Sequence, residues 1–373
     1  MTLYCGIDLH STNNYVAILN DKLERVAGQR LGNDLDEVLR MLSPYRREIA
    51  GIAVESTFNW YWLVDGLMDA DYRLHLVNTN KVKQYDGMKY SDDRHDARWL
   101  ARLLALDILP VGYIYPQEDR PLRDLLRRRS FLVKKRSSML ISMRGAFECR
   151  TGMRVRSNDL KTWTEEDLDH LVSDPDVRLG ISCLLELIKA MNEQIEVIEK
   201  WVLPRARLRP EFRMLETVWG IGKILALTIM YEVGDITRFE KVGNFASYCR
   251  LVNSEYISNG KRKGKGNSKN GNPYLSWAFS EAAHFANQHR KPAKKFIQQK
   301  RKKTNGIVAN RALAHKLARA SYYVMRDLVE FDPTKVFGAT QCELMYLDMH
   351  LTKVTTICSV LGHESVPQES RGI

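Results

Sequence analysis

Four carboxylates in the first hundred residues have the types and spacing of a metal-binding set. Asp8 and Glu55 each end a short apolar run, whereas Asp93 and Asp96 stand three residues apart where a helical pattern begins. On a helix such a pair lies side by side on one face, so the two carboxylates repel each other. A divalent cation between them removes the repulsion, and two Mg²⁺ ions held by four carboxylates are suited to phosphodiester chemistry.

Each of these acids also has an ordinary explanation when it is taken alone. Asp8 has the position of a turn residue after a strand, and Glu55 has that of a helix cap. Asp93 and Asp96 suit a first helical turn, where acidic side chains are favoured, and a charged helix face is usually only solvated. The combination of all four in this order favours the metal site.

The elements that must position the four acids alternate between strand and helix. Apolar runs and turn residues predict three antiparallel strands, followed by helix, strand, helix, strand and a closing helix. The expected strands are residues 3–8, 15–19, 24–31, 49–55 and 74–77, and the expected helices are 34–42, 59–69 and 88–104. This is the order of an α/β RNase H/RuvC-like fold, in which the first and fourth strands are neighbours. We therefore predict a domain over residues 1–105 with the acids at one end of its sheet.

Composition excludes several classes of protein and favours a polyanionic partner. The chain has 373 residues, of which 44% are hydrophobic and 27% charged, so it can form a proper core. No apolar run has the length of a membrane span and no signal pattern opens the chain, so we expect a cytoplasmic protein of a bacterial or archaeal cell. The six scattered cysteines argue against zinc and disulfides. The net charge of +12 favours nucleic acid.

The positive charge is concentrated in residues 120–136, 261–269 and 290–303. Solubility alone is one explanation, but three separate clusters favour contact with a phosphate backbone. The residues of these clusters that we expect to bind nucleic acid are Arg127, Arg128, Arg129, Lys134, Lys135, Lys261, Arg262, Lys263, Lys265 and Lys269.

Residues 106–205 are expected to be mainly helical. A basic helix from Arg120 to about Cys149 precedes a seam of apolar residues that recur every three or four positions over residues 184–202. Such a 3.5-residue repeat predicts a coiled coil. The seam has two explanations that the sequence leaves open, packing within the chain and self-association.

Residues 206–335 are expected to form a second domain, and residues 336–373 form a tail of unknown role. Gly220 and Gly222 suggest a helix–hairpin–helix, in which they and Lys223 would bind a phosphate at a helix start. The segment Leu251–Leu275 is rich in Gly, Asn and Lys and is expected to be a flexible loop, followed by a helix over residues 274–287. Its serines are either turn residues or a nucleophile for phosphate.

Short motifs in both halves together resemble the DEDD-type insertion-sequence transposases related to the Piv invertases, which are RNA-guided ("bridge RNA") recombinases. The motifs are Gly6-Ile7-Asp8, Val54-Glu55-Ser56, Asp93-Arg94-His95-Asp96-Ala97, Gly220-Ile221-Gly222, and Ser268-Lys269-Asn270-Gly271-Asn272 followed by Tyr274-Leu275. The resemblance covers about residues 3–330. The start of the chain also has some likeness to the phosphate loop of sugar and acetate kinases, but those loops need Gly where His10 stands and lack the later pair of acids.

The resemblance implies a site and a mechanism. Asp8, Glu55, Asp93 and Asp96 would hold Mg²⁺, and Ser268 would attack DNA to give a covalent phosphoserine intermediate. It further implies DNA and a guide RNA as partners, and a homo-oligomer from dimer to tetramer in which acids and serine come from different subunits. Two positions are ambiguous: Asp92 competes with Asp93, and Ser258 is the fallback nucleophile. Trp219 stands where the family commonly has proline.

Two other functions fit part of the sequence. A metal-dependent nuclease such as a junction resolvase would use the acids with water, and Ser268 would then be dispensable. A nucleic-acid-binding protein with an inactive RuvC-like fold would keep its cellular effect when Asp8 or Glu55 is replaced.

Overall fold

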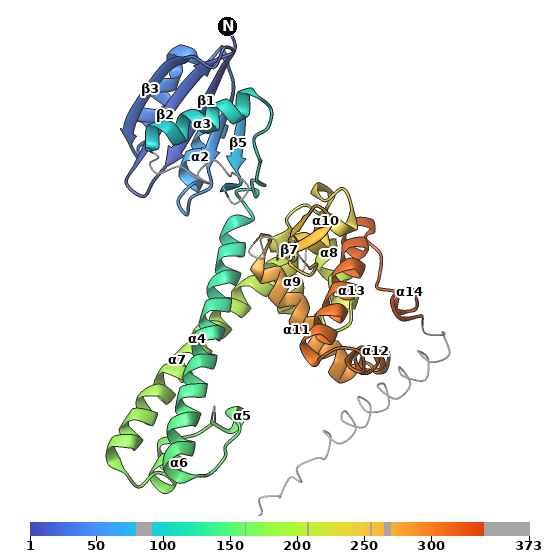
Figure 1. Cartoon of the computed structure of the whole chain (residues 1–373). Helices are drawn as coiled ribbons and strands as arrows, with labels where there is room; N and C mark the ends of the chain where they lie inside the picture. Colours follow the sequence, from blue (N-terminus) through green and yellow to red (C-terminus); the bar gives the residue numbers. More distant parts are fainter. Residues whose placement is uncertain (80–91, 161, 207–208, 254–255, 265–269, 339–373) are drawn as a thin grey trace, which may run out of the picture. The chain divides into compact units, whose positions relative to one another are not determined.

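The computed structural model describes residues 1–79, 92–160, 162–206, 209–253, 256–264 and 270–338 (Figure 1). The chain divides into two compact units, residues 1–118 and the residues from 119 on. The first unit is an α/β domain with a mixed sheet, and the second is mostly helical. No helix of the described segments is long and apolar enough to cross a membrane. The four cysteines that lie in them, Cys5, Cys149, Cys183 and Cys249, are free thiols.

The first unit is built on a five-stranded sheet in the order β3-β2-β1-β4-β5. β1 pairs antiparallel with β2 and parallel with β4, β2 pairs antiparallel with β3, and β4 pairs parallel with β5. The first and fourth strands are therefore neighbours, as predicted. The strands are β1 (Leu3–Leu9), β2 (Asn13–Asn20), β3 (Arg25–Gly32), β4 (Ile49–Glu55) and β5 (Leu74–Val77).

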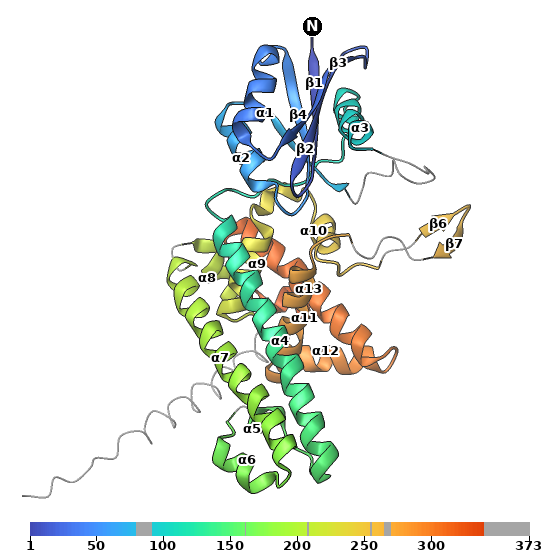
Figure 2. The same cartoon turned by 90° about the vertical axis from the view of Figure 1, so that its left-hand side faces the viewer.

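Helices cover both faces of this sheet (Figure 2). The main core fills the face under α1 (Leu35–Leu42) and α2 (Tyr61–Asp69). The short 3₁₀ helix η1 (Ser43–Tyr45) directly follows α1 in the sequence. Helix α3 (Asp93–Ala105) lies against β1 and β2 on the opposite face. Side chains alternate along a strand, so the apolar residues of β1 enter the main core while Asp8 lies on the α3 face.

The second unit begins with two long helices, α4 (Arg120–Thr151) and α7 (Pro175–Ala206), which pack against each other. The other helices are α5 (Ser157–Leu160), α6 (Glu165–Leu171), α8 (Pro210–Thr217), α9 (Lys223–Val233), η3 (Ile236–Arg238), α10 (Val242–Tyr248), α11 (Pro273–His289), α12 (Lys291–Arg301), α13 (Gly306–Asp327) and α14 (Pro333–Phe337). Its core is formed mainly by α8, α9, α11 and α13.

Most of the predicted seam of α7 is buried within one chain. Ile188 lies in a cluster with Leu140 and Met143 of α4, and Val202 lies in the core that also contains Leu126. Packing within the chain is thus one use of the seam. A coiled coil through which the chain self-associates stays a prediction, as does the helix–hairpin–helix at α8 and α9.

The segment predicted as a flexible loop contains a short hairpin. β6 (Tyr256–Ser258) pairs antiparallel with β7 (Lys261–Gly264). The two residues between them, Asn259 and Gly260, have φ of +50° and +68°. A tight two-residue hairpin turn requires positive φ at both central residues, and Asn-Gly favours such a turn. This turn explains why the structure has a hairpin where a flexible loop was predicted.

Candidate active site

Two of the four predicted acids meet because β1 and β4 are parallel neighbours. Asp8 lies near the end of β1, and Glu55 is the last residue of β4. The two side chains share a hydrogen bond. Asp8 is only 1% exposed and Glu55 is half-buried, so water has little access to the Asp8 carboxyl.

The other two acids are placed by the first turn of α3. Asp93 Oδ1 lies 3.3 Å from His10 Nε2, which itself lies 3.1 Å from Asp8 Oδ2. The charge of Asp96 acts on both Asp8 and Glu55. The structure therefore brings the four predicted acids together.

Asp92 has a different position from Asp93. It is the N-cap of α3, and its carboxylate accepts a hydrogen bond of 2.7 Å from the backbone N–H of His95. A cap of this kind satisfies a helix N–H that would otherwise lack a partner. This geometry favours Asp93 over Asp92 as the acid of the site.

Crowding of the acids alters their protonation. Burial raises the pKa of Glu55 to about 8, together with the hydrogen bond to Asp8 and the charges of Asp8 and Asp96. Burial also raises the pKa of Asp8, although Glu55 and His10 oppose this effect. Without a cation the site therefore favours a protonated carboxyl, because several negative charges cannot be kept so close together.

His10 is a residue of this site that the sequence analysis did not assign. Its backbone is held by three hydrogen bonds: its carbonyl accepts from Asn33 Nδ2 and Asn59 Nδ2, each at 3.0 Å, and its N–H donates to Asn13 O at 2.9 Å. The only signal for it in the sequence is its place two residues after Asp8.

Arg30 is a second residue that the sequence analysis missed. Its Nη2 lies 2.5 Å from Asp93 Oδ2, and its Nη1 donates to Asn13 Oδ1 at 3.2 Å. In the sheet, Asp8 is opposite Tyr15 and Tyr15 is opposite Arg30. Residues in one such row share a face, so the strand register is the signal that would have found Arg30.

The residues present fit a divalent cation. Asp8 Oδ2 is buried and has no hydrogen-bond partner among the described residues, although His10 is near. One ligand atom from each of Asp8, His10 and Asp93 can be chosen so that all three lie within 4.8 Å of one another. Hard divalent cations favour carboxylate oxygens of this kind.

The predicted serines lie in the second unit. Ser268, Lys265 and Lys269 are outside the described residues. Ser258 is the last residue of β6 and is partly exposed, and Lys261 and Lys263 of β7 are exposed. Arg262 is also in β7.

The predicted glycine turn connects α8 to α9. Gly220 has φ of +81°, and a methyl group there would lie 2.0 Å from the carbonyl oxygen of Ala282. Gly222 caps α9, and both it and Lys223 are exposed. The turn lines a cavity of about 560 Å³ that Arg290 also reaches. Trp219 stacks on Phe337 with ring centroids 5.3 Å apart, so this ring packs within the unit.

The basic residues of α4 differ in their surroundings. Arg127 donates to Glu232 with its Nε at 2.5 Å and its Nη2 at 2.8 Å, and Arg129 Nε donates to Glu199 at 2.7 Å. Arg128, Lys134 and Lys135 are exposed. Contact of these three residues with a phosphate backbone stays a prediction.

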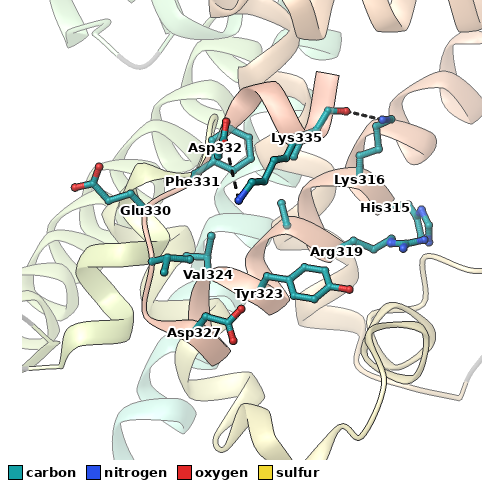
Figure 3. A pocket seen from close by; sticks show the side chains of 13 residues that line it. His315, Lys316, Arg319, Tyr323, Val324, Asp327, Glu330, Phe331, Asp332 and Lys335 are labelled. Atoms are coloured by element: carbon teal, nitrogen blue, oxygen red, sulfur yellow. Dashed lines mark hydrogen bonds and ion pairs between the residues drawn. The ribbon is translucent and has the colours of Figure 1, made fainter. Parts of the chain in front are cut away.

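A further cavity of about 680 Å³ lies between α13 and α14 (Figure 3). Its lining contains the cationic side chains of Lys316, Arg319 and Lys335. It also contains the acidic side chains of Asp327 and Asp332. No predicted site residue lines it.

Comparison with known proteins gives matches in both units. A family model described as a transposase, of the DEDD type found in IS110, matches residues 5–148, and the model "Transposase IS116/IS110/IS902 family" matches residues 212–298. The transposase for insertion sequence element IS1111A of Coxiella burnetii is 24% identical over 219 residues, which are 57% of this chain and 59% of the relative. The putative transposase y4qE of Sinorhizobium fredii is 25% identical over 213 residues, or 56% and 51%.

The chain thus spans between half and three fifths of the length of these curated relatives. The first model covers Asp8, Glu55, Asp93 and Asp96, and the second covers the glycine turn and Ser268. The order of the two models along the chain is the order of the sequence motifs. On this agreement, the chain belongs to the IS110 family of DEDD transposases.

Proposed function

We propose that the protein is a DNA transposase of a mobile insertion element. It would cut and rejoin DNA in an active site where Asp8, Glu55, Asp93 and Asp96 hold Mg²⁺. The observation that carries the proposal is the convergence of these four acids, with the buried Asp8 next to Glu55 and under the influence of Asp93 and Asp96. The two transposase models support it further. Mg²⁺, when bound, supplies positive charge that stabilises the phosphate oxygens as the DNA bond breaks.

The chain's own residues prepare this site in three ways. The acids provide the oxygen ligands, and burial of Asp8 keeps competing water away from its carboxylate. Arg30 holds one oxygen of Asp93, so that the other oxygen faces His10. The first turn of α3 keeps Asp93 and Asp96 on a rigid element, which limits the reorganisation needed for reaction.

The covalent step is assigned to Ser268. Its Oγ forms a bond to the DNA phosphorus, one bridging P–O bond breaks, and the proton of the serine ends on the departing DNA oxygen. The phosphoserine conserves the energy of the phosphodiester, so that attack by a DNA hydroxyl can reverse the step without ATP. Ser258 is the alternative nucleophile.

The proposed partners are DNA, comprising the element ends and target, and a guide RNA encoded by the element. The exposed cations at Arg128, Lys134, Lys135, Lys223 and Lys261 are suited to phosphate contacts. We also propose that the protein acts as a homo-oligomer.

The test uses the purified full chain, any co-purified RNA, Mg²⁺ and DNA carrying the sequence that flanks its gene. A DNA adduct that survives denaturant is sought in the wild type and in Ser268→Ala, Ser258→Ala and Asp8→Asn. Asp69→Asn is the control, because Asp69 is an exposed acid of α2.

Loss of the adduct in Ser268→Ala and Asp8→Asn, with retention in Ser258→Ala and Asp69→Asn, is the expected result. Cleaved DNA without an adduct, unaffected by Ser268→Ala, would instead establish a nuclease that uses water. DNA binding without cleavage, unchanged in Asp8→Asn, would establish an inactive binding protein.

A further inference from the structure

We infer that His10 is a direct ligand of the divalent cation through Nε2, so that the site combines carboxylates with an imidazole. This inference rests on the proposed function, in which the acids hold such a cation. It adds a nitrogen ligand to the four acids.

The geometry of three ligand atoms carries the inference. His10 Nε2 lies 3.1 Å from Asp8 Oδ2 and 3.3 Å from Asp93 Oδ1. A cation with ligand distances of about 2.1 Å has neighbouring ligands roughly 3 Å apart, which is the spacing seen here. The two distances from the imidazole therefore match those between neighbouring ligands of one cation, and all three ligand atoms lie within 4.8 Å of one another.

Both carboxylates offer the appropriate oxygen. Asp8 Oδ2 is buried without a hydrogen-bond partner among the described residues. Asp93 has its Oδ2 paired with Arg30, which leaves Oδ1 facing the imidazole. A cation between these atoms would give the buried Asp8 oxygen a charged ligand partner in addition to the nearby imidazole of His10.

The backbone of His10 is fixed in the way expected of a ligand. Asn33 follows β3 and Asn59 precedes α2, yet both amides donate to the same carbonyl, that of His10. Thr57 Oγ1 in turn donates to Asn59 Oδ1 at 2.9 Å. Supporting hydrogen bonds of this kind reduce the freedom that a ligand loses when a metal binds. The imidazole remains 44% exposed, which leaves a route for the cation to enter.

A nitrogen ligand changes the selectivity of the site. Affinity for an imidazole-containing site rises along the first-row metals, and Mg²⁺ binds nitrogen poorly compared with oxygen. The site should therefore favour Mn²⁺ over Mg²⁺ more strongly than carboxylates alone would. Replacing His10 by Gln should narrow this preference, because the amide offers oxygen in place of nitrogen.

The test uses Mn²⁺ as the probe with the purified full chain. Electron spin-echo envelope modulation of bound Mn²⁺ detects a directly coordinated ¹⁴N nucleus. The wild type is compared with His10→Gln, with protein labelled with ¹⁵N-histidine, and with Asp8→Asn. His95→Gln is the control, because His95 is exposed on the first turn of the same helix as Asp93. Circular dichroism verifies that each variant is folded.

We expect ¹⁴N modulation in the wild type and in His95→Gln, its replacement by ¹⁵N modulation in labelled protein, and its loss in His10→Gln. We also expect His10→Gln to weaken Mn²⁺ binding by at least roughly tenfold. A loss of this size is already typical when a residue that only supports a metal ligand is replaced. Binding that Asp8→Asn weakens, but without ¹⁴N modulation in the wild type, would overturn the inference and leave the acid site intact. Binding that Asp8→Asn does not change would overturn the proposed metal site itself.

Discussion

A methyl group on Gly6 would lie 2.1 Å from the carbonyl oxygen of Ala97. The same methyl group would lie 2.6 Å from the backbone nitrogen of Ala101, so α3 crosses β1 at a distance that only glycine permits. Asp8 follows Gly6 by two residues on the same face of β1, and Asp93 precedes Ala97 by one helical turn. The close approach of strand and helix therefore sets the distance between the acids.

Gly6→Ala should accordingly weaken metal binding as well as stability. The new methyl group meets backbone atoms that cannot rotate away, and overpacking of this kind costs about 1–3 kcal/mol. The displacement of α3 moves Asp93 and Asp96 away from Asp8. Isothermal titration with Mn²⁺ and urea unfolding measure the two effects. Gly32→Ala is the matched control, since its methyl group would meet only Glu37 Oε2, at 3.5 Å. Mn²⁺ affinity equal to that of the wild type would contradict the prediction.

Asp8→Asn should separate stability from metal binding. Without metal, the negative charges of Asp93 and Asp96 oppose that of the buried Asp8, so removing the Asp8 charge should leave the unfolding temperature unchanged or raise it. With metal, the wild type gains about 2.7 kcal/mol at a free concentration of 100 Kd, and the variant should lose most of this gain. Thermal unfolding with EDTA and with Mg²⁺ measures both. A variant that is destabilised in EDTA and still stabilised by Mg²⁺ would refute this account.

The raised pKa of Glu55 predicts a pH dependence for the metal-free protein. Burial first, then Asp8 and Asp96, raise this pKa from 4.5 to about 8. The folded state therefore binds more protons than the unfolded state between these values, and stability falls as the pH rises through this window. The stability that protonation of Glu55 contributes to the folded state is complete below pH 4.5 and is lost above the folded pKa of about 8.

Glu55→Gln should remove this part of the pH dependence. Between pH 6 and pH 9 in EDTA, we expect the unfolding temperature of the wild type to fall by about 4 °C more than that of the variant, the shift that 1 kcal/mol gives to a domain of this size. The shift is this small because Glu55 is partly exposed and water screens its interactions with the other acids. Parallel pH profiles in differential scanning calorimetry would show that Glu55 titrates normally.

The acids could be located from the sequence because each one ends or begins a strongly patterned element. Apolar runs defined β1 and β4, and the order of elements made these strands neighbours, so Asp8 and Glu55 had to converge. Local patterns also placed Asp93 on the first turn of α3. For these residues, the signal lies within a few positions of the residue itself.

Residues that depend on pairing across strands or between distant helices could not be found in this way. Arg30 reaches the site only through the register of β2 and β3. The basic character of Arg127 indicated nucleic acid, yet its nearest partner, Glu232, is 105 residues away in the sequence. The hairpin at Asn259-Gly260 was not predicted, because β6 is only three residues long and β7 is mostly Lys and Gly, which are depleted in strands.

The pairing of Glu232 predicts how the second unit depends on a buried charge. Glu232 is 2% exposed and accepts from Arg123, Arg127 and Asn272, which is the N-cap of α11. Burial would raise its pKa, but the arginines and the amide hold the pKa below its usual value. Glu232→Gln leaves two guanidinium groups without their counter-charge, so we expect a loss of about 3 kcal/mol in urea unfolding. Glu240→Gln is the control, because Glu240 is exposed, and its stability should stay within about 0.5 kcal/mol of the wild type. The same small change in Glu232→Gln would mean that the network contributes little to the fold and that Arg127 is available for nucleic acid.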